Sequence, residues 1–299
     1  MESRLEQAAA CLSPSLRYRL EQLGTGEQQC CEEIRLRIGQ PLQVTLRGKE
    51  QALPGSRLTS EEIAMAFSRA AEYSLHTYAD SLCQGFLTLR GGHRIGVCGQ
   101  TAVQQGRVLS FRCISSLNIR IARQLKGTAT PELLEQLQET DSIISALFLS
   151  PPGRGKTTLL RDIARQMSDR GVRTALADER SELAALHDGV PQFDIGQHSD
   201  VIDGCPKAEA AMMLVKTMSP QLLVLDEITS EADARAAEYA SHCGVAVLAS
   251  AHAWNWDDFR QRPLYRKLLE RNIFSRIFCI QANRHVVRIE PQGKENTEC

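Results

Sequence analysis

The sequence predicts an α/β fold, in which a domain with a parallel-core sheet follows a smaller α+β domain. Three observations support this prediction. After about residue 131, short buried apolar runs alternate with helical patterns, as in a parallel sheet covered on both faces. Before about residue 125, apolar and polar residues alternate between glycine-containing turn signals. A loop ending in Gly-Lys-Thr separates the first buried run from a long helical pattern.

The composition is that of a globular protein without a global positive field. Of 299 residues, 42% are apolar, which is enough for a sizeable core. Lys and Arg (35) nearly balance Asp and Glu (36), so no nucleic-acid partner is expected. No apolar run approaches the ~20 residues needed to cross a bilayer, and the N-terminus has no signal-type apolar block. We therefore expect a cytoplasmic protein.

The ten cysteines include no Cys-x-x-Cys pair and no histidine spacing that would close a zinc site. We interpret them as thiols in a reducing compartment, most of them small core residues. A disulfide framework is the less favoured alternative.

The N-terminal domain shows a strand pattern over residues 32–47. Apolar and polar positions alternate there, as in a half-buried strand. The apolar face carries Ile34, Leu36 and Ile38, and the opposite face carries Arg35 and Arg37. A solvated strand face explains both arginines.

A helix and a set of hairpins follow in the same domain. Thr59 and Glu62 have the spacing of a capping box, and apolar residues then recur at helical spacing. Between residues 86 and 123, alternating runs are separated by turn signals at Gly91-Gly92 and Gln105-Gly106. This pattern predicts an antiparallel sheet, and with it an α+β domain.

The domain boundary is predicted within residues 124–130, just before Pro131. A proline suits the first turn of a helix, here over the segment PELLEQLQ. The prediction assigns residues 1–125 to the N-terminal domain and residues 131–291 to a RecA-like nucleotide-binding domain. The polar residues 292–299 are expected to form a flexible tail.

Five buried strands are predicted in the second domain, at residues 145–150, 172–177, 221–225, 245–250 and 275–280. The second of them lies between the strand before the Gly-rich loop and the strand before Asp226. Those two strands are therefore not sequential neighbours, as in RecA-like and AAA-type folds.

The segment SPPGRGKTT, from Ser150 to Thr158, joins a predicted strand to a predicted helix. Such a loop directs backbone N–H groups at phosphate, its lysine neutralises phosphate oxygens, and the next hydroxyl binds Mg²⁺. The predicted nucleotide-binding residues are Pro152, Gly153, Arg154, Gly155, Lys156, Thr157 and Thr158. ATP and Mg²⁺ are the expected ligands. The usual pattern begins with Gly where this chain has Ser150, so a degenerate loop is the alternative.

Asp226 and Glu227 follow the apolar run LLVL, the form of a strand that carries metal-binding and water-activating carboxylates. We predict that Asp226 and Thr157 hold Mg²⁺ and that Glu227 polarises the attacking water. Carboxylates at a helix N-terminus look the same in sequence. The position of the pair after Lys156, with one strand between them, favours the functional reading.

Two further strand ends reach the edge where open α/β sheets bind ligands. Glu179 follows the second strand and is a candidate for supporting metal or water. His252 ends the fourth strand and is a candidate sensor of the γ-phosphate. A solvated cap and a loop histidine, respectively, explain these two residues about as well.

Several ordered segments resemble the stage III sporulation protein AA family. They are EEIRLRIGQPL, GGHRIGVCG, SSLNIRIAR, ADERSELA, GVPQFDIG, DVIDGCPKAEAAMMLVKTMSP, LLVLDEI and LASAHA. That family is similar to the ATPases of type II and type IV secretion and pilus systems. The resemblance implies a hexameric ring ATPase at the cytoplasmic face of the mother-cell membrane. It would drive or gate a channel to the forespore, with membrane proteins of the stage III sporulation channel as partners.

The chain departs from the family pattern at three positions, with Ser150 for Gly, Lys216 for Arg and Thr229 for Gly. Lys216 keeps the charge but loses the bidentate fork, which puts a phosphate or intersubunit role there in doubt.

In related ring ATPases, arginines of the N-terminal domain reach the γ-phosphate. The resemblance therefore implies a catalytic role for Arg120, with Arg94 and Arg123 as the next candidates. A cation of this kind contributes ~10³ or more in rate.

The sequence thus predicts Mg-ATP hydrolysis, with Lys156, Glu227, Glu179, His252 and Arg120 as catalytic residues. A GTPase is disfavoured because no Asn-Lys-x-Asp motif follows. Two other classes stay open: a nucleic-acid motor, which the balanced charge does not encourage, and a nucleotide-dependent assembly scaffold with little hydrolysis.

Overall fold

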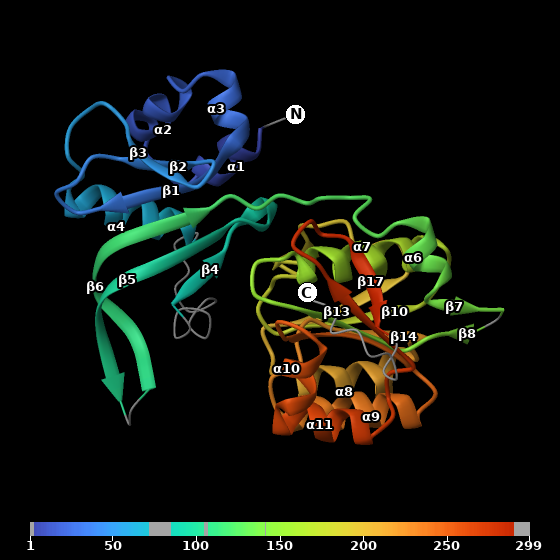
Figure 1. The fold of residues 1–299 in the computed structure, drawn as a ribbon. Coiled ribbons are helices and arrows are strands. Elements are labelled where there is room, and N and C mark those ends of the chain that lie inside the picture. The colour runs from blue at the N-terminus through green and yellow to red at the C-terminus, as the bar shows by residue number, and fades with distance from the viewer. Residues whose placement is uncertain (1–2, 72–84, 105–106, 141, 290–299) are drawn as a thin grey trace. The chain divides into compact units, whose positions relative to one another are not determined.

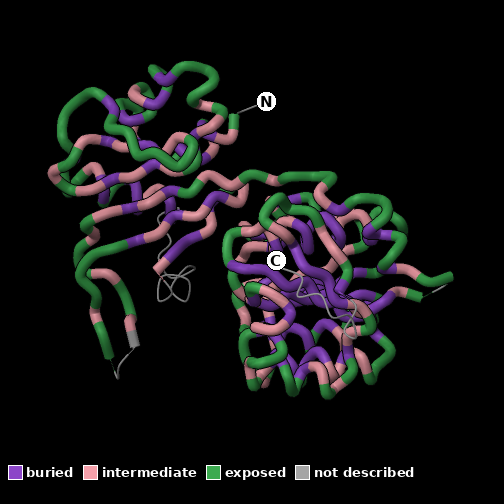
Figure 2. The backbone as a smooth tube through the Cα atoms, in the orientation of Figure 1, coloured by how far each residue is buried: buried purple, intermediate pink, exposed green. Residues whose placement is uncertain are grey.

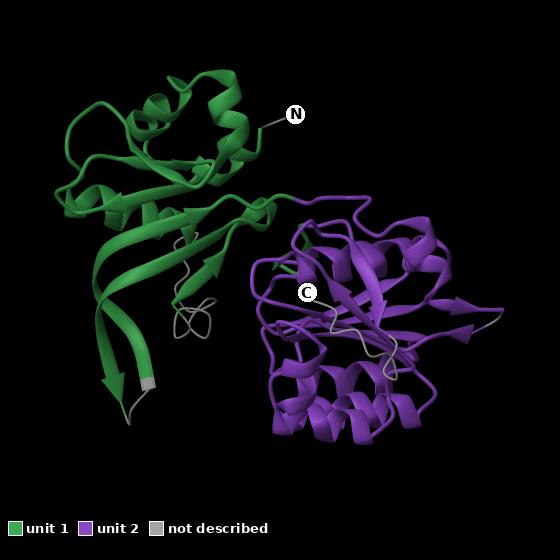
Figure 3. Cartoon of the chain, in the orientation of Figure 1, with its two compact units in different colours: residues 1–123, 186–192 green, residues 124–185, 193–299 purple. Residues whose placement is uncertain are grey.

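The protein, seen here in a computed structural model, is described over residues 3–71, 85–104, 107–140 and 142–289 (Figure 1). It consists of two compact units (Figure 3). Unit 1 comprises residues 1–123 together with residues 186–192, and unit 2 comprises residues 124–185 and 193–299. The return of residues 186–192 to unit 1 was not predicted from the sequence.

Unit 1 is an α+β unit with a six-stranded antiparallel sheet in the order β3-β2-β1-β6-β5-β4. Its strands are β1 (Cys31–Arg37), β2 (Gln43–Leu46), β3 (Lys49–Ala52), β4 (Phe86–Thr88), β5 (Arg94–Gln104) and β6 (Arg107–Arg120). Its helices are α1 (Arg4–Ala9), α2 (Pro14–Glu21), α3 (Thr25–Cys30) and α4 (Ser60–Ala70), with a 3-10 turn η1 (Arg90–Gly92). The apolar faces of these elements enclose one core.

The strand pattern over residues 32–47 forms two antiparallel strands, β1 and β2, instead of one. Ile34 and Leu36 are fully buried, as predicted, but Ile38 is 45% exposed. The alternation fails there because the strand ends at Arg37 and Gly39 turns the chain with a φ of 73°. Residues Arg35 and Arg37 do lie on the solvated face.

The predicted capping box at Thr59 and Glu62 is present at the start of α4. The turn at Gly91-Gly92 lies between β4 and β5, which pair antiparallel as predicted. Gln105 and Gly106 lie outside the described residues, but β5 and β6 on either side of them form a long antiparallel ribbon. Figure 2 shows that the far part of this ribbon is largely exposed.

Unit 2 has a seven-stranded sheet in the order β13-β10-β14-β15-β9-β16-β17, in which only β17 pairs antiparallel among the described strands. Its strands are β9 (Ala146–Ser150), β10 (Thr174–Asp178), β13 (Ser199–Asp203), β14 (Leu222–Leu225), β15 (Ala246–His252), β16 (Arg276–Ile280) and β17 (Val286–Ile289). The five predicted strands are confirmed. The two edge strands, β13 and β17, were not predicted.

The strands before the Gly-rich loop and before Asp226, β9 and β14, are not neighbours in the sheet. The strand between them is β15, which pairs with both. The strand that lies between them in sequence, β10, pairs with the other side of β14. The carboxyl ends of β10, β14, β15 and β9 therefore meet along one edge of the sheet.

Helices cover both faces of this sheet, as Figure 1 shows. Helix α7 (Lys156–Asp169) lies on one face, and α8 (Lys207–Met218), α9 (Glu231–His242) and α11 (Pro263–Glu270) lie on the other. A shorter helix, α10 (Trp256–Gln261), packs beside α11 through stacked Phe259 and Tyr265 rings. All residues of β9, β10 and β14 are buried, as expected of strands covered on both faces.

The helix predicted over PELLEQLQ is shorter than expected. Helix α6 spans Pro131–Glu135, and the chain then enters a small hairpin of β7 (Gln138–Glu139) and β8 (Ser142–Ile143). Gln138, the last residue of the predicted helix, instead pairs with Ile143 in this hairpin. A second small hairpin, β11 (Leu186–His187) with β12 (Val190–Pro191), belongs to unit 1.

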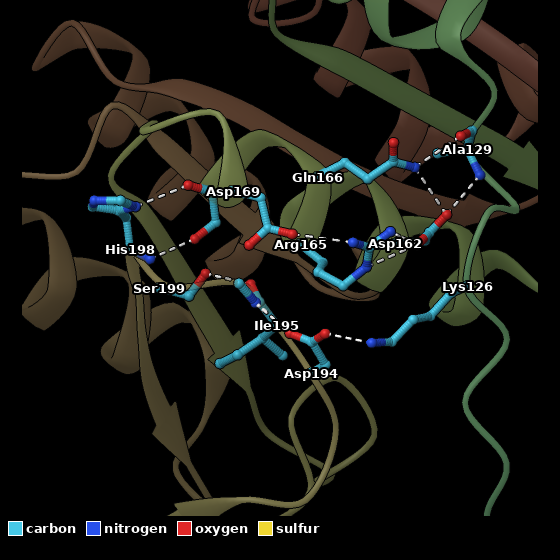
Figure 4. Close-up of polar contacts among 12 residues, drawn as sticks. Lys126, Ala129, Asp162, Arg165, Gln166, Asp169, Asp194, Ile195, His198 and Ser199 are labelled. Atoms are coloured by element: carbon cyan, nitrogen blue, oxygen red, sulfur yellow. Dashed lines mark hydrogen bonds and ion pairs between the residues drawn. The ribbon is translucent and has the colours of Figure 1, made fainter.

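The segment around residues 124–130 is held to helix α7 (Figure 4). Asp162 of α7 accepts hydrogen bonds from the Ala129 amide at 2.9 Å and the Gln166 side chain at 3.1 Å. Lys126 pairs with Asp194 at 2.5 Å. The start of unit 2 is thus fixed to the helix that follows the Gly-rich loop.

Among the described residues, no helix is both long enough and apolar enough to cross a membrane. The view of most cysteines as core thiols is wrong. Cys11 and Cys31 are buried free thiols, but Cys98, Cys113 and Cys243 are exposed and Cys279 is disulfide-bonded. Spacing alone does not show which thiols reach solvent.

Candidate nucleotide-binding site

The Gly-rich loop lies between β9 and the first turn of α7. Gly153 and Gly155 have φ values of 77° and 92°, which is the region that favours glycine. Ser150 is fully buried with a negative φ, and its hydroxyl donates to the Pro151 carbonyl at 3.1 Å. Glycine's freedom is therefore used at Gly153 and Gly155 and is not needed at Ser150.

Lys156, the first residue of α7, lies against the loop that precedes it. Its Nζ donates to the carbonyls of Ser150 and Pro151, each at 3.1 Å. Burial lowers the pKa of Lys156 to about 8, although the nearby carboxylates of Glu227 and Asp226 oppose that shift. The loop thus holds a buried cation beside the helix N-terminus, where phosphate groups bind.

Thr157 and Asp226 bring the loop and the end of β14 together. The Thr157 hydroxyl donates to Asp226 Oδ1 at 2.9 Å. Burial raises the pKa of Asp226 to about 6, and the charges of Glu182 and Asp178 raise it further. The Ser250 hydroxyl and amide of β15 both donate to the Asp226 carbonyl, which fixes the backbone at this point.

Glu227 and His252 form a second pair one residue further on. His252 Nδ1 lies 2.7 Å from Glu227 Oε1. Burial lowers the pKa of His252 and the nearby Lys156 lowers it further, although the Glu227 carboxylate opposes that shift. The contact with His252 restrains the Glu227 carboxylate. The role of His252 as a sensor of the γ-phosphate stays a prediction.

Glu179 lies beside a cation that the sequence analysis did not single out. Its Oε2 is 3.3 Å from Nζ of Lys207, the first residue of α8. Lys207 also donates to the Glu227 carbonyl at 2.6 Å. No motif marks a lysine at the start of a helix, so this contact could not be predicted from the sequence.

Asp178, immediately before Glu179, organises the loop after β10. Its two carboxylate oxygens accept four backbone N–H groups, from Glu182, Leu183, Ala184 and Ala185, at 2.7 to 3.3 Å. Ser181 and Ala185 in this loop have left-handed φ values of 52° and 51°. Non-glycine residues hold such conformations only where surrounding contacts fix them, and functional sites are enriched in them.

Arg161 of α7 supports the same loop from the other side. Its guanidinium donates to the carbonyls of Leu183 at 2.7 Å and Glu182 at 2.5 Å, and lies 4.0 Å from the Phe193 ring centroid. The helix that follows the phosphate loop is therefore tied to the loop that carries Glu179. The sequence analysis missed Asp178 and Arg161 because both act through backbone groups.

A cavity of about 400 Å³ adjoins the Gly-rich loop. It is lined by Leu125, Thr128, Gly153, Arg154, Gly155, Thr158, Leu159, Ile280 and Arg284. Its volume lies in the range of small-molecule sites, and it combines apolar walls with two guanidinium groups. Of the predicted loop residues, Gly153, Arg154, Gly155 and Thr158 line it, whereas Lys156, Thr157 and the exposed Pro152 do not.

The donor set fits Mg²⁺ bound together with a nucleotide. Within the described residues, no group of three or more His, Cys, Asp or Glu side chains could hold a metal ion alone. Mg²⁺ typically uses one or two protein oxygens and completes its shell with water and substrate phosphates. The Thr157 hydroxyl and the Asp226 carboxylate, 2.9 Å apart at the loop, match that requirement.

Comparison with known proteins identifies the family. The family model described as "Sporulation stage III, protein AA" matches residues 2–296. The chain belongs to this family. It is 40% identical over 278 residues to the stage III sporulation protein AA of Bacillus subtilis (strain 168), covering 91% of this chain and 89% of that protein.

Solved structures similar to this family member share its fold. The ATPase DotB from Legionella pneumophila superposes with a TM-score of 0.60 over 93% of this chain and 80% of that chain, at 16% identity. The pilus retraction motor PilT, solved with bound ADP, superposes with a TM-score of 0.59 over 94% of this chain and 83% of that chain, also at 16% identity. The RecA-like P-loop fold class predicted from the sequence is therefore confirmed.

The departures from the family pattern have local explanations in this structure. The Thr229 amide and hydroxyl both donate to Asp233 Oδ2, at 2.9 and 3.1 Å, so this threonine strengthens the start of α9. Lys216 lies in the last turn of α8, exposed, 6.0 Å from the Tyr239 ring centroid. It is not among the residues that meet at the phosphate loop.

Arg120 and the other candidate arginines of this family member lie in unit 1. The Arg120 side chain is 68% exposed, with its Nε 3.8 Å from Glu33 Oε1. Arg94 stacks on Phe86 at 3.5 Å, and Arg123 donates to the backbone carbonyls of Gln29 and Cys31. Arg120 is thus the most available of the three for a ligand, and its catalytic role stays a prediction.

Proposed function

We propose that this chain binds Mg-ATP and hydrolyses it, as the ATPase of a secretion-like complex at the channel between mother cell and forespore. The observation that carries the proposal is the 2.9 Å contact between Thr157 and Asp226. It joins the phosphate loop to the strand end that carries Glu227, so the groups for binding phosphate and activating water share one site.

The residues of this site have distinct tasks in the proposed reaction. The amides of residues 153–158 bind phosphate at the N-terminus of α7, and Lys156 exchanges its loop carbonyls for phosphate oxygens. Thr157 and Asp226 would hold Mg²⁺, which would neutralise charge on the phosphates. Glu227, oriented by His252, hydrogen-bonds the attacking water. Arg120 adds positive charge at the γ-phosphate, supplied by the same or a neighbouring subunit.

The surroundings of the reaction are part of the same proposal. The family membership supports a role in endospore formation, and the RecA-like fold is shared with proteins named as an ATPase and a pilus retraction motor. We infer a homo-oligomeric ring, hexameric by analogy, located in the cytoplasm at the face of the mother-cell membrane. Membrane proteins of the stage III channel are the proposed partners.

Turnover of Mg-ATP by the purified full chain tests the proposal. We expect turnover that rises more than linearly with protein concentration, falls at least about 10²-fold in Lys156→Ala and Glu227→Gln, and ignores added DNA. Lys267→Ala, which removes an exposed lysine of α11, is the control and should behave as wild type. A wild-type rate equal to that of Lys156→Ala would contradict hydrolysis and leave an assembly scaffold. Strong stimulation by DNA would indicate a nucleic-acid motor.

A further inference from the structure

Lys207 is a buried cation among carboxylates of the proposed nucleotide site. Its side chain is 6% exposed. Its Nζ donates to the Glu227 carbonyl at 2.6 Å and lies 3.3 Å from Glu179 Oε2 and 3.9 Å from Asp233 Oδ2. The proposed reaction described above assigns it no task.

Local packing does not explain a lysine at this position. A cation at a helix N-terminus faces the positive end of the helix dipole, and burial removes its hydration. An apolar side chain of similar volume would fill the same space, and such replacements of buried ion pairs are often neutral or stabilising. The charge of Lys207 is therefore best explained by the groups that it contacts.

Those groups come from three separate segments around the reaction site. Glu179 follows β10, Glu227 follows β14, and Asp233 lies in the first turn of α9. The remaining faces of two of them are already bound: Glu227 contacts His252 through its carboxylate, and Asp233 accepts the Thr229 and Ser230 amides. The Lys207 ammonium supplies the contact that connects the Glu227 backbone with the Glu179 carboxylate.

We propose that Lys207 is a positioning residue for nucleotide hydrolysis, which sets the Glu227 backbone and the Glu179 carboxylate at the distance that the attacking water requires. The proposal rests on the proposed function. Lys207 need not touch nucleotide, because its Nζ is occupied by these carboxylate and carbonyl groups. Its loss should therefore slow turnover and leave nucleotide affinity nearly unchanged.

The test compares Lys207→Met with Lys267→Met, the same change at an exposed position of α11. We measure kcat for Mg-ATP and the dissociation constant of a non-hydrolysable ATP analogue with Mg²⁺. Misplacing reacting groups by about 1 Å costs about 10²-fold in rate, so we expect a kcat loss near that size in Lys207→Met and a dissociation constant within about threefold of wild type. Lys267→Met should match wild type in both.

Two results would overturn the proposal while the proposed function stands. One is a Lys207→Met kcat within about threefold of wild type, with Lys156→Ala inactive. The other is a loss of affinity as large as the loss of kcat, which would make Lys207 a binding residue. Should Lys207→Met fail to fold, Lys207→Gln keeps a donor for the Glu227 carbonyl but no charge, and the same separation of kcat from affinity is expected at about 10-fold.

Failure of the proposed function would give a different experimental result. Wild-type turnover equal to that of Lys156→Ala would remove the reaction itself. Amide hydrogen exchange then decides the structural half of the proposal, because freeing the Glu227 carbonyl and the Glu179 carboxylate should speed exchange at residues 179–182 and 227–230 in Lys207→Met. Exchange equal to that in Lys267→Met would overturn the positioning role.

Discussion

Glu33 of β1 and Asp178 of β10 are strand carboxylates that find their partners in different ways. Glu33, in unit 1, meets the partly exposed side chains of Arg35 at 2.7 Å and Arg120 at 3.8 Å. Asp178, in unit 2, is 1% exposed and is bound by four backbone amides of its own loop. The first arrangement fixes little backbone, whereas the second fixes an entire loop.

The same contrast holds for the cations of the two units. In unit 2, Lys156, Arg161 and Lys207 are buried and bind backbone carbonyls. In unit 1, Arg35 and Arg37 pair with glutamates on a solvated strand face. Arg161 and Lys207 are expected to keep these contacts when a ligand arrives, whereas Lys156 is proposed to exchange its carbonyls for phosphate oxygens. Exposed charge such as that of Arg120 is free to move toward a ligand.

Asp178→Asn should have the largest effect on stability among the changes that test this contrast. The amide presents a donor where two backbone N–H groups need an acceptor, and we expect a loss of about 3–5 kcal/mol. Urea unfolding monitored by circular dichroism measures it. A loss below about 1 kcal/mol would show that the loop does not depend on this carboxylate.

Asp226→Asn should change the stability in the opposite direction and make the protein more stable. The pKa of Asp226 is about 6 in the folded protein, whereas the ordinary pKa of an aspartate is 3.8. The stability of the wild type therefore falls as the pH rises between these two values. The amide removes this cost, and the variant should be more stable by about 1–3 kcal/mol at pH 7 to 8. The difference should vanish below about pH 4. Thermal unfolding over this pH range, in EDTA and without nucleotide, checks both statements.

Much of unit 2 could be predicted from the sequence because its strands are buried on both faces. The bounds of β9, β14 and β16 were predicted to within a residue or two, because short apolar runs between turn signals are typical of buried strands. The edge strands β13 and β17 were missed. Every residue of β13 is only half-buried, and its sequence SDVID contains no apolar run by which a strand could be recognised.

The candidate site was predicted only where a motif describes it. Thr157 with Asp226 was expected from the loop and the strand end. The roles of Asp178 and Lys207 were not, because a carboxylate that binds amides and a lysine that binds a carbonyl depend on how distant segments meet. The short α6 and the exposed Ile38 show the same limit, since a turn or a hairpin pairing ended each pattern.

Thr229→Gly, which introduces the glycine implied by the family resemblance, should be destabilising here by about 1 kcal/mol. It removes the hydroxyl donor to Asp233 and adds backbone freedom to the unfolded chain. Thr229→Ser keeps the hydroxyl and should stay close to wild type. Equal stability of the glycine and serine variants would argue against a structural role for this hydroxyl. Chemical denaturation of the three proteins in parallel gives the comparison.

Glu33→Gln should have the smallest effect. Pairs between exposed or half-exposed charges contribute roughly 0–1 kcal/mol, so we expect a change below about 1 kcal/mol, which shrinks further in high salt. Unfolding at low and high ionic strength measures it. A loss as large as that of Asp178→Asn would break the contrast between the two units.

The excursion of residues 186–192 into unit 1 means that the backbone passes between the units three times, at 123/124, 185/186 and 192/193. A cut at the first junction alone would not yield two self-sufficient halves, because unit 1 would lose a hairpin. The second junction, 185/186, directly follows the loop that Asp178 binds, so the end of this loop and the start of the unit 1 hairpin are consecutive in the chain.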